Sequence, residues 1–96
     1  MRNYYLVAYD IRNSKRLRKV FIKMRGYGDA LQFSVFLCKL SSTEKMLMLS
    51  ELLRIIKQDE DSLMIIYLGS LSGEEQSKIE FIGKKQELTE DSSVII

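Results

Sequence analysis

The chain has no histidine, no proline and no tryptophan, and Cys38 is its only cysteine. Without histidine, the sequence excludes Ser/His and Cys/His catalytic arrangements, histidine metal sites and imidazole acid–base chemistry. A single cysteine excludes an intrachain disulfide and a cysteine-rich zinc site, and Cys38 lies in an apolar run where we expect structural burial. Any hydrolytic chemistry would therefore depend on carboxylates, a metal ion and water.

Long apolar runs are also missing, because no stretch approaches the ~20 residues that a membrane helix needs. The first residues lead straight into a strand-like segment, without the apolar region and small-residue cleavage site of a secretory signal. We therefore expect no membrane partner and a cytoplasmic location. With 96 residues, the chain suits one domain with a modest core, so burial between two copies would help stability.

Acidic residues are scarce in the first part of the chain. Residues 1–40 hold nine Lys or Arg and two Asp, whereas residues 41–73 hold three against five and residues 74–96 three against six. No acid occurs between Lys15 and Arg25, although a solvated helix face usually mixes charges of both signs. We predict contact with a nucleic-acid backbone, and a merely solvated face is the alternative. The predicted binding residues are Arg12, Lys15, Arg16, Arg18, Lys19 and Lys23.

Hydrophobic spacing predicts a strand over residues 4–9, which ends at Asp10, and then a helix capped by Asn13 or Ser14. Its apolar stripe comprises Leu17, Val20, Phe21 and Met24. We expect the helix to end near residues 26–28, where glycine can adopt a left-handed conformation. Residues 30–40 are predicted to form two strands that meet at a tight bend or a bulge near Ser34.

A second helix is predicted to start at Ser41, because Ser41 and Glu44 match a capping box. Its predicted buried stripe comprises Met46, Leu49, Leu53 and Ile56, widened by Leu52. A polar turn over residues 58–61 and a buried strand over residues 62–68 follow. The order β-α-β-β-α-β predicts an α+β, ferredoxin-like fold.

Two apolar segments remain after that fold is complete. Residues 79–82 favour β-structure, and we predict that they form an additional strand paired across a homodimer, through Ile79, Phe81 and Ile82. Residues 1–83 then form the domain, including this dimer-swapped strand. Residues 84–96 form a flexible acidic tail that ends in the apolar run 93–96.

Asp10 is the strongest candidate for a catalytic and metal-binding residue, because a side chain at a strand end projects from a rigid scaffold. The alternative is that Asp10 only accepts hydrogen bonds from the following turn. One carboxylate binds Mg²⁺ poorly, but two copies of Asp10 facing each other across a dimer axis could share one ion. That ion could activate water for phosphodiester hydrolysis.

Four motifs in order resemble one family: Tyr9-Asp10-Ile11, residues 15–20, residues 26–28 and residues 32–36. They resemble the small CRISPR-associated adaptation protein that partners the spacer integrase, and the resemblance covers residues 4–82. It implies a ferredoxin-like dimer that spans double-stranded DNA between integrase subunits during spacer acquisition. It also implies metal-dependent endonuclease activity on RNA or duplex DNA at Asp10. Tyr9, Arg16, Arg18 and Phe36 match or adjoin positions that support it.

Three functions follow as hypotheses. We favour a scaffold that binds nucleic acid without sequence specificity in the CRISPR adaptation complex, with Mg²⁺-dependent hydrolysis at Asp10 as an added activity. The alternative is a standalone metal-dependent endoribonuclease, of which a toxin-like protein is one form. A small-molecule regulatory domain ranks last, because the loops at residues 10–14 and 40–43 lack glycine. By the resemblance, the tail beyond Gly83 would contact the integrase.

Overall fold

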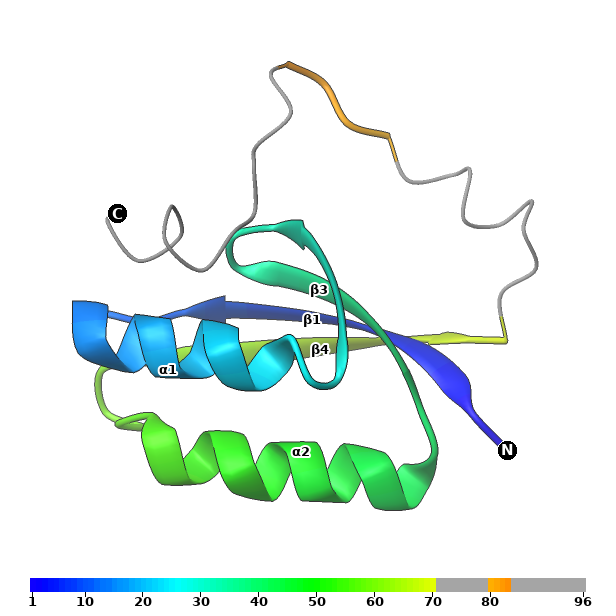
Figure 1. Ribbon diagram of the computed structural model, residues 1–96, viewed down its shortest axis with the longest axis horizontal. Helices are drawn as coiled ribbons and strands as arrows, with labels where there is room; N and C mark the ends of the chain where they lie inside the picture. The colour runs from blue at the N-terminus through cyan, green and yellow to red at the C-terminus, as the bar shows by residue number, and fades with distance from the viewer. Residues whose placement is uncertain (71–79, 84–96) are drawn as a thin grey trace.

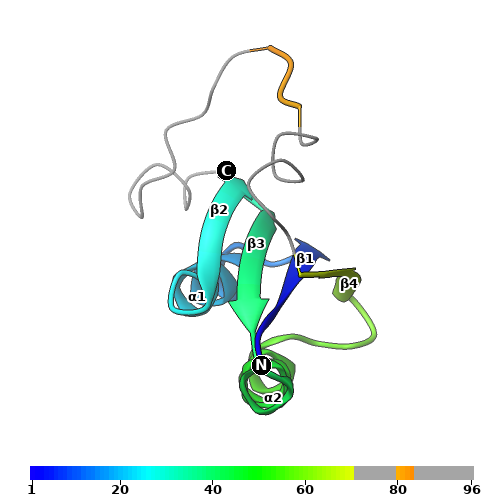
Figure 2. The same cartoon turned by 90° about the vertical axis from the view of Figure 1, so that its right-hand side faces the viewer.

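The computed structural model describes residues 1–70 and 80–83, and its elements follow the predicted order (Figure 1). The four strands form one antiparallel sheet in the order β2-β3-β1-β4, and both helices cover the same face of it (Figure 2). The α+β, ferredoxin-like prediction is confirmed, but the last strand, which was predicted to be buried, lies at the edge of the sheet and has no buried residue. The elements are β1 (Asn3–Asp10), α1 (Ser14–Met24), β2 (Gly28–Gln32), β3 (Val35–Leu40), α2 (Ser42–Ile55) and β4 (Ser62–Gly69).

Strand β1 is central, because it pairs with β3 on one side and β4 on the other. Its side chains alternate between the two faces of the sheet. Tyr5, Val7 and Tyr9 are buried against the helices, whereas Leu6 and Ala8 are half-buried on the face that the helices leave open. We call this second face the open sheet face.

Helix α1 begins where the sequence predicts. The Asn13 side chain is the N-cap and accepts a hydrogen bond from the Arg16 N–H at 3.0 Å. Val20, Phe21 and Met24 are buried in the core, as the predicted stripe requires. Three turns of helix are thereby fixed on the sheet with their polar side directed outwards.

Glycine acts at the end of α1 in a different way from the one predicted. Among the described residues, positive φ angles occur at Gly69 and Gly83, so neither Gly26 nor Gly28 adopts the left-handed conformation. Gly28 instead allows a close approach between strands: a Cβ atom there would lie 2.5 Å from the Leu37 carbonyl oxygen and 2.6 Å from the Cys38 Sγ. Close pairing of β2 with β3 therefore explains this glycine.

Strands β2 and β3 form a hairpin whose turn lies at residues 33–34, so the predicted bend near Ser34 is confirmed. The register shifts between Ala30 and Gln32, which is the signature of a β-bulge. The Ser34 carbonyl accepts a hydrogen bond from the Tyr9 N–H at 3.0 Å, and this bond extends the sheet to the end of β1.

Helix α2 has the predicted capping box, and its predicted buried stripe is confirmed at Leu52, Leu49 and Ile56, which are buried or pack against the core, but not at Met46 and Leu53. Met48 and Leu52 are fully buried, whereas Met46 is 71% exposed and Leu53 is 47% exposed. Apolar residues surround much of this helix, so several stripes at helical spacing overlap in the sequence. Spacing alone could not choose between them.

Beyond β4, the structure describes residues 80–83, which form no strand within a single chain. Glu80 and Phe81 lie beside the open sheet face, where they line a shallow pocket of about 250 Å³ with Leu6 and Leu68. Ile79 and the predicted tail, residues 84–96, lie outside the described residues. The dimer-swapped strand therefore stays a prediction.

No helix within residues 1–70 and 80–83 is both long and apolar enough to cross a membrane.

Candidate nucleic-acid interface

Asp10 lies at the end of β1, opposite Ser62 of β4, on the same side of the strand as Leu6 and Ala8. Its side chain is 68% exposed, and Arg12 Nη2 lies 3.9 Å from its Oδ2 atom. An ion pair this open to water contributes little stability. The Asp10 carboxylate is therefore accessible at the open sheet face.

The backbone N–H groups that follow Asp10 donate their hydrogen bonds to side chains other than that of Asp10. The Arg12 N–H donates to Asp61 Oδ1 at 2.9 Å, and the Arg16 N–H donates to Asn13. The role that the alternative prediction gave to Asp10 thus belongs to Asp61 and Asn13. This leaves the Asp10 oxygens available for an external ligand.

One chain does not hold a complete metal site in the part that the structure describes. Residues 1–70 and 80–83 contain no group of three or more His, Cys, Asp or Glu side chains placed to hold an ion. Mg²⁺ prefers six oxygen ligands and is bound by one or two carboxylates together with waters and substrate phosphates. A single Asp10 can supply at most half of the predicted shared site.

Tyr9 and Phe36, the predicted supporting residues, lie on the opposite face of the sheet from the Asp10 side chain. Both are buried in the core, with stacked rings 6.3 Å apart. The Tyr9 hydroxyl donates to the Phe33 carbonyl at 2.7 Å, and burial raises its pKa above the usual range. These two side chains hold the end of β1 in place, and the structure does not bring them to the carboxylate.

Four of the six predicted cations are exposed to solvent. Arg12 lies in the loop that leads into α1, and its side chain is 70% exposed. Lys15, Arg18 and Lys19 are spaced by three and four residues, so they share one side of the helix. These four residues form what we call the cationic face.

Arg16 does not belong to the cationic face, contrary to the prediction. Its side chain is only 17% exposed. Its Nε atom donates to Asp61 Oδ2 at 2.8 Å, and its Nη2 atom donates to Glu60 Oε1 at 2.8 Å. The acids come from the turn between α2 and β4, which folding brings against the start of α1. The guanidinium is thus occupied inside the protein.

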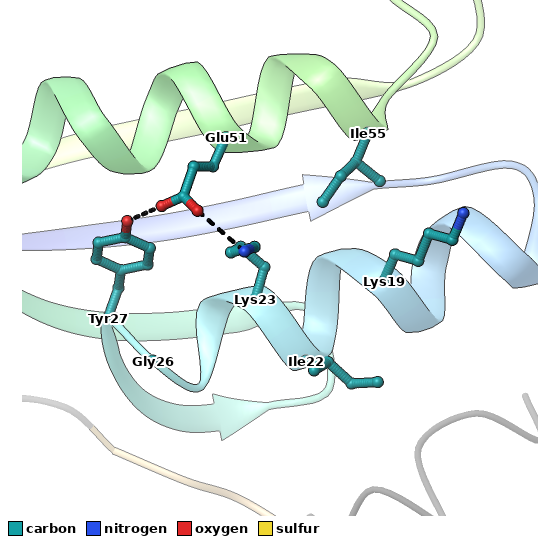
Figure 3. A pocket seen from close by; sticks show the side chains of 7 residues that line it. All are labelled: Lys19, Ile22, Lys23, Gly26, Tyr27, Glu51 and Ile55. Carbon is teal, nitrogen blue, oxygen red and sulfur yellow. Dashed lines mark hydrogen bonds and ion pairs between the residues drawn. The ribbon is translucent and has the colours of Figure 1, made fainter.

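Lys23 is also paired within the chain. Its Nζ atom lies 2.9 Å from Glu51 Oε2 on α2, and the other Glu51 oxygen accepts a hydrogen bond from the Tyr27 hydroxyl (Figure 3). This bond raises the pKa of Tyr27 to about 12. Figure 3 shows the Lys19 side chain directed away from this cluster. Lys23 therefore joins the two helices, and Lys19 is left to the solvent.

Sequence reasoning missed Asp61, which lies in a turn that was predicted only as the end of α2. It is the buried charged residue of the described chain, with 6% of its surface exposed. Its carboxylate accepts hydrogen bonds from Arg12, Arg16 and Lys57. The antiparallel pairing of β4 with β1 places Asp61 at the end of the sheet where the loop after Asp10 begins, and no local sequence pattern shows this pairing.

Comparison with known proteins confirms the family resemblance. The family model described as CRISPR associated protein Cas2 matches residues 1–75. The CRISPR-associated endoribonuclease Cas2 1 of Rhodospirillum rubrum is 38% identical over 92 residues, which cover 96% of this chain and 89% of that protein. The CRISPR-associated endonuclease Cas2 of Halalkalibacterium halodurans is 36% identical over 95 residues, covering 94% of this chain and 96% of that protein. The crystal structure of Streptococcus pyogenes Cas2 at pH 6.5 has a TM-score of 0.72 and 30% identity, and the match covers 83% of this chain and 99% of that one. The chain therefore belongs to the Cas2 family of CRISPR-associated proteins.

Proposed function

We propose that this chain forms a homodimer that binds double-stranded DNA through its phosphate backbone, as the scaffold on which the CRISPR integrase subunit assembles. The observation that carries the proposal is the cationic face, Arg12, Lys15, Arg18 and Lys19, which is exposed and contains no acid in α1. Clustered cations attract phosphates and release condensed counterions when they bind. Membership of the Cas2 family supports the assignment to CRISPR adaptation.

The open sheet face supports the homodimer. Met64 is 57% exposed and Ile66 is 41% exposed on this face, beside the half-buried Leu6 and Ala8. Nearby, Phe81 is 59% exposed. A second copy would remove this apolar area from water and double the cationic face. Because Asp10 shares the open sheet face, a symmetric pairing could also bring two Asp10 carboxylates to one interface.

Anisotropy of a labelled DNA duplex, measured over a range of salt concentrations, tests the scaffold. Each phosphate that the protein neutralises should contribute about −0.9 to the log–log slope of affinity against salt. Arg18→Gln should therefore weaken binding and flatten the slope. Arg54→Gln, which removes an exposed cation from α2, is the matched control and should leave the slope unchanged. Equal effects of the two variants, or no binding by the wild-type protein, would refute the proposal.

A metal-dependent endonuclease is the second candidate, and the specific observation that favours it is the exposed Asp10 carboxylate beside Arg12. The relatives from R. rubrum and H. halodurans are named endoribonuclease and endonuclease. Two Asp10 side chains in a dimer would hold Mg²⁺, which would supply an activated water and offset phosphate charge. Arg12 would bind the phosphate next to that site. A standalone endoribonuclease is the form of this activity that acts without an integrase.

Cleavage assays on labelled RNA and duplex DNA, with Mg²⁺ or EDTA, separate the two candidates. For a nuclease, Asp10→Asn should abolish Mg²⁺-dependent cleavage while binding is kept. Asp59→Asn, an exposed acid in the turn after α2, should cleave like the wild type. Cleavage that survives Asp10→Asn would point to a contaminating enzyme, and binding without cleavage would leave the scaffold as the function.

A further inference from the structure

Asp61 joins three segments of the chain through one buried carboxylate, whose side chain is 0% exposed. Its Oδ1 atom accepts from the Arg12 N–H at 2.9 Å and from Arg16 Nη2 at 3.2 Å. Its Oδ2 atom accepts from Arg16 Nε and from the Lys57 N–H, both at 2.8 Å. The hydrogen bond from the Arg16 side chain is the main reason why the pKa of Asp61 lies well below its usual range, so the carboxylate is charged.

The place of Asp61 in the fold links it to the candidate interface. It directly precedes Ser62, the residue that pairs with Asp10 across β1 and β4. Its backbone partner Arg12 lies two residues after Asp10, and its side-chain partner Arg16 lies in the first turn of α1. The loop between β1 and α1 is therefore held by the sheet at one end and by Asp61 at the other.

Arg16 has a mostly buried side chain, and three of its five N–H donors are used within the protein, which leaves those of Nη1. Its Nε and Nη2 atoms donate to Asp61, and Nη2 also donates to Glu60 at 2.8 Å. Taking the guanidinium away would leave Asp61 buried without a counter-charge, which is costly in a protein interior. An arginine in this position acts on binding through the loop that it helps to hold.

We propose that Asp61, with Arg16 as its counter-charge, is the positioning residue of the candidate interface. Asp61 fixes the position of Arg12 relative to Asp10. The proposal rests on the proposed nucleic-acid binding. It makes Arg12 the residue through which Asp61 acts. Lys19 lies in the second turn of α1, so its contribution to binding should not depend on Asp61.

A pair of double-mutant cycles on duplex affinity tests the proposal with the full-length protein. Asp61→Asn should weaken binding about fivefold or more in the wild-type background, and much less when Arg12→Gln is already present. The same change combined with Lys19→Gln should be additive. Glu44→Gln is the charge-matched control, because it removes an acid from an ion pair at the other end of the sheet. It should not weaken binding.

If Asp61 only stabilised the fold, the two double-mutant cycles would give the same result. In that case Asp61→Asn would weaken binding equally with either cation removed, and equal coupling would overturn the proposal. If Asp61→Asn does not fold, as circular dichroism would show, Arg16→Lys replaces it in both cycles, because lysine keeps the charge and loses the paired N–H donors. If the wild-type protein does not bind the duplex at all, the proposed function fails instead.

Hydrogen exchange supplies a readout that does not depend on nucleic acid. The Arg12 amide donates to Asp61 and should exchange slowly in the wild-type protein. Asp61→Asn should accelerate exchange at Arg12 while leaving the core amides of β1, such as that of Val7, protected. Unchanged exchange at Arg12 would contradict the proposed positioning.

Discussion

Glu44 has two roles at the start of α2. Its Oε1 atom accepts from the Ser41 N–H at 2.8 Å and from Arg2 Nε at 2.8 Å, and its Oε2 atom accepts from Arg2 Nη2 at 2.9 Å. These bonds, above all those from Arg2, lower the pKa of Glu44 from 4.5 to about 2. A carboxyl group with a lowered folded pKa stabilises the fold above its unfolded pKa. That contribution is lost as pH falls through the folded pKa.

Acid unfolding of a single-residue variant tests this linkage. Between pH 4.5 and pH 2, the melting temperature of the wild-type protein should fall more steeply than that of Glu44→Gln, because the glutamine cannot titrate. Above this window the wild-type protein should be the more stable of the two. Thermal melts followed by circular dichroism over this range would show it. Parallel curves for the two proteins would contradict the role of Glu44.

Gly28 provides a second test at the scale of one residue. Its added Cβ would lie within 3.0 Å of backbone atoms of β3, which cannot move aside as a flexible side chain can. Gly28→Ala should therefore lower the free energy of unfolding by about 1–3 kcal/mol, the usual cost of overpacking. In Gly26→Ala the nearest atom is the Lys23 carbonyl oxygen at 3.3 Å, so this control should be milder. Urea denaturation compares them, and equal losses would refute the close approach.

Single residues differ in how far the sequence predicts their roles. Asn13 and Ser41 cap helices through hydrogen bonds to residues three positions away, so a local pattern predicts both. Arg16 and Asp61 lie 45 positions apart, and their contact exists only because β4 pairs with β1. Charge counting placed Arg16 on the exposed face for this reason, and no local pattern could have corrected it.

The elements themselves were predicted from their periods and caps, but the face that each one buries depends on its neighbours. For α1 a single apolar stripe left no choice, so the buried residues were predicted correctly. Helix α2 carries apolar residues on several sides, and contact with the sheet selects Met48 and Leu52. Tyr9 and Phe36 were predicted to support Asp10, but the alternation of side chains along β1 and β3 places them on the opposite face of the sheet.

The two methionines of α2 measure which face is buried. Met48→Ala should lower the free energy of unfolding by about 2–5 kcal/mol, because it leaves a cavity in the core. Met46→Ala makes the same chemical change at a side chain that is 71% exposed, and its effect should stay within about 0.5 kcal/mol. Urea denaturation of both variants measures the two losses in the free energy of unfolding. A larger loss for Met46→Ala would restore the stripe that the sequence predicted.

For the whole molecule, the sheet separates two sides whose exposed side chains differ in chemistry. The helices cover one face, where Lys15, Arg18 and Lys19 are exposed on α1, while the open sheet face exposes Met64 and Ile66. A dimer formed through the open sheet face would leave both cationic faces free to meet one duplex. The double variant Met64→Gln, Ile66→Gln adds no charge to that side, so it can separate dimerisation from electrostatics.

Light scattering and salt titration of this double variant give the last prediction. It should be monomeric at concentrations where the wild-type protein is a dimer, because two buried amides would lack partners. Since one copy then contacts about half as many phosphates, the slope of log affinity against log salt should fall to about half its wild-type value. Met46→Gln with Leu53→Gln replaces a methionine and a leucine at exposed positions of α2, a closely similar pair of changes, and should alter neither quantity. A monomeric variant that keeps the full slope would mean that one copy binds the duplex alone, whereas a variant that stays dimeric would place the contact between copies on another surface.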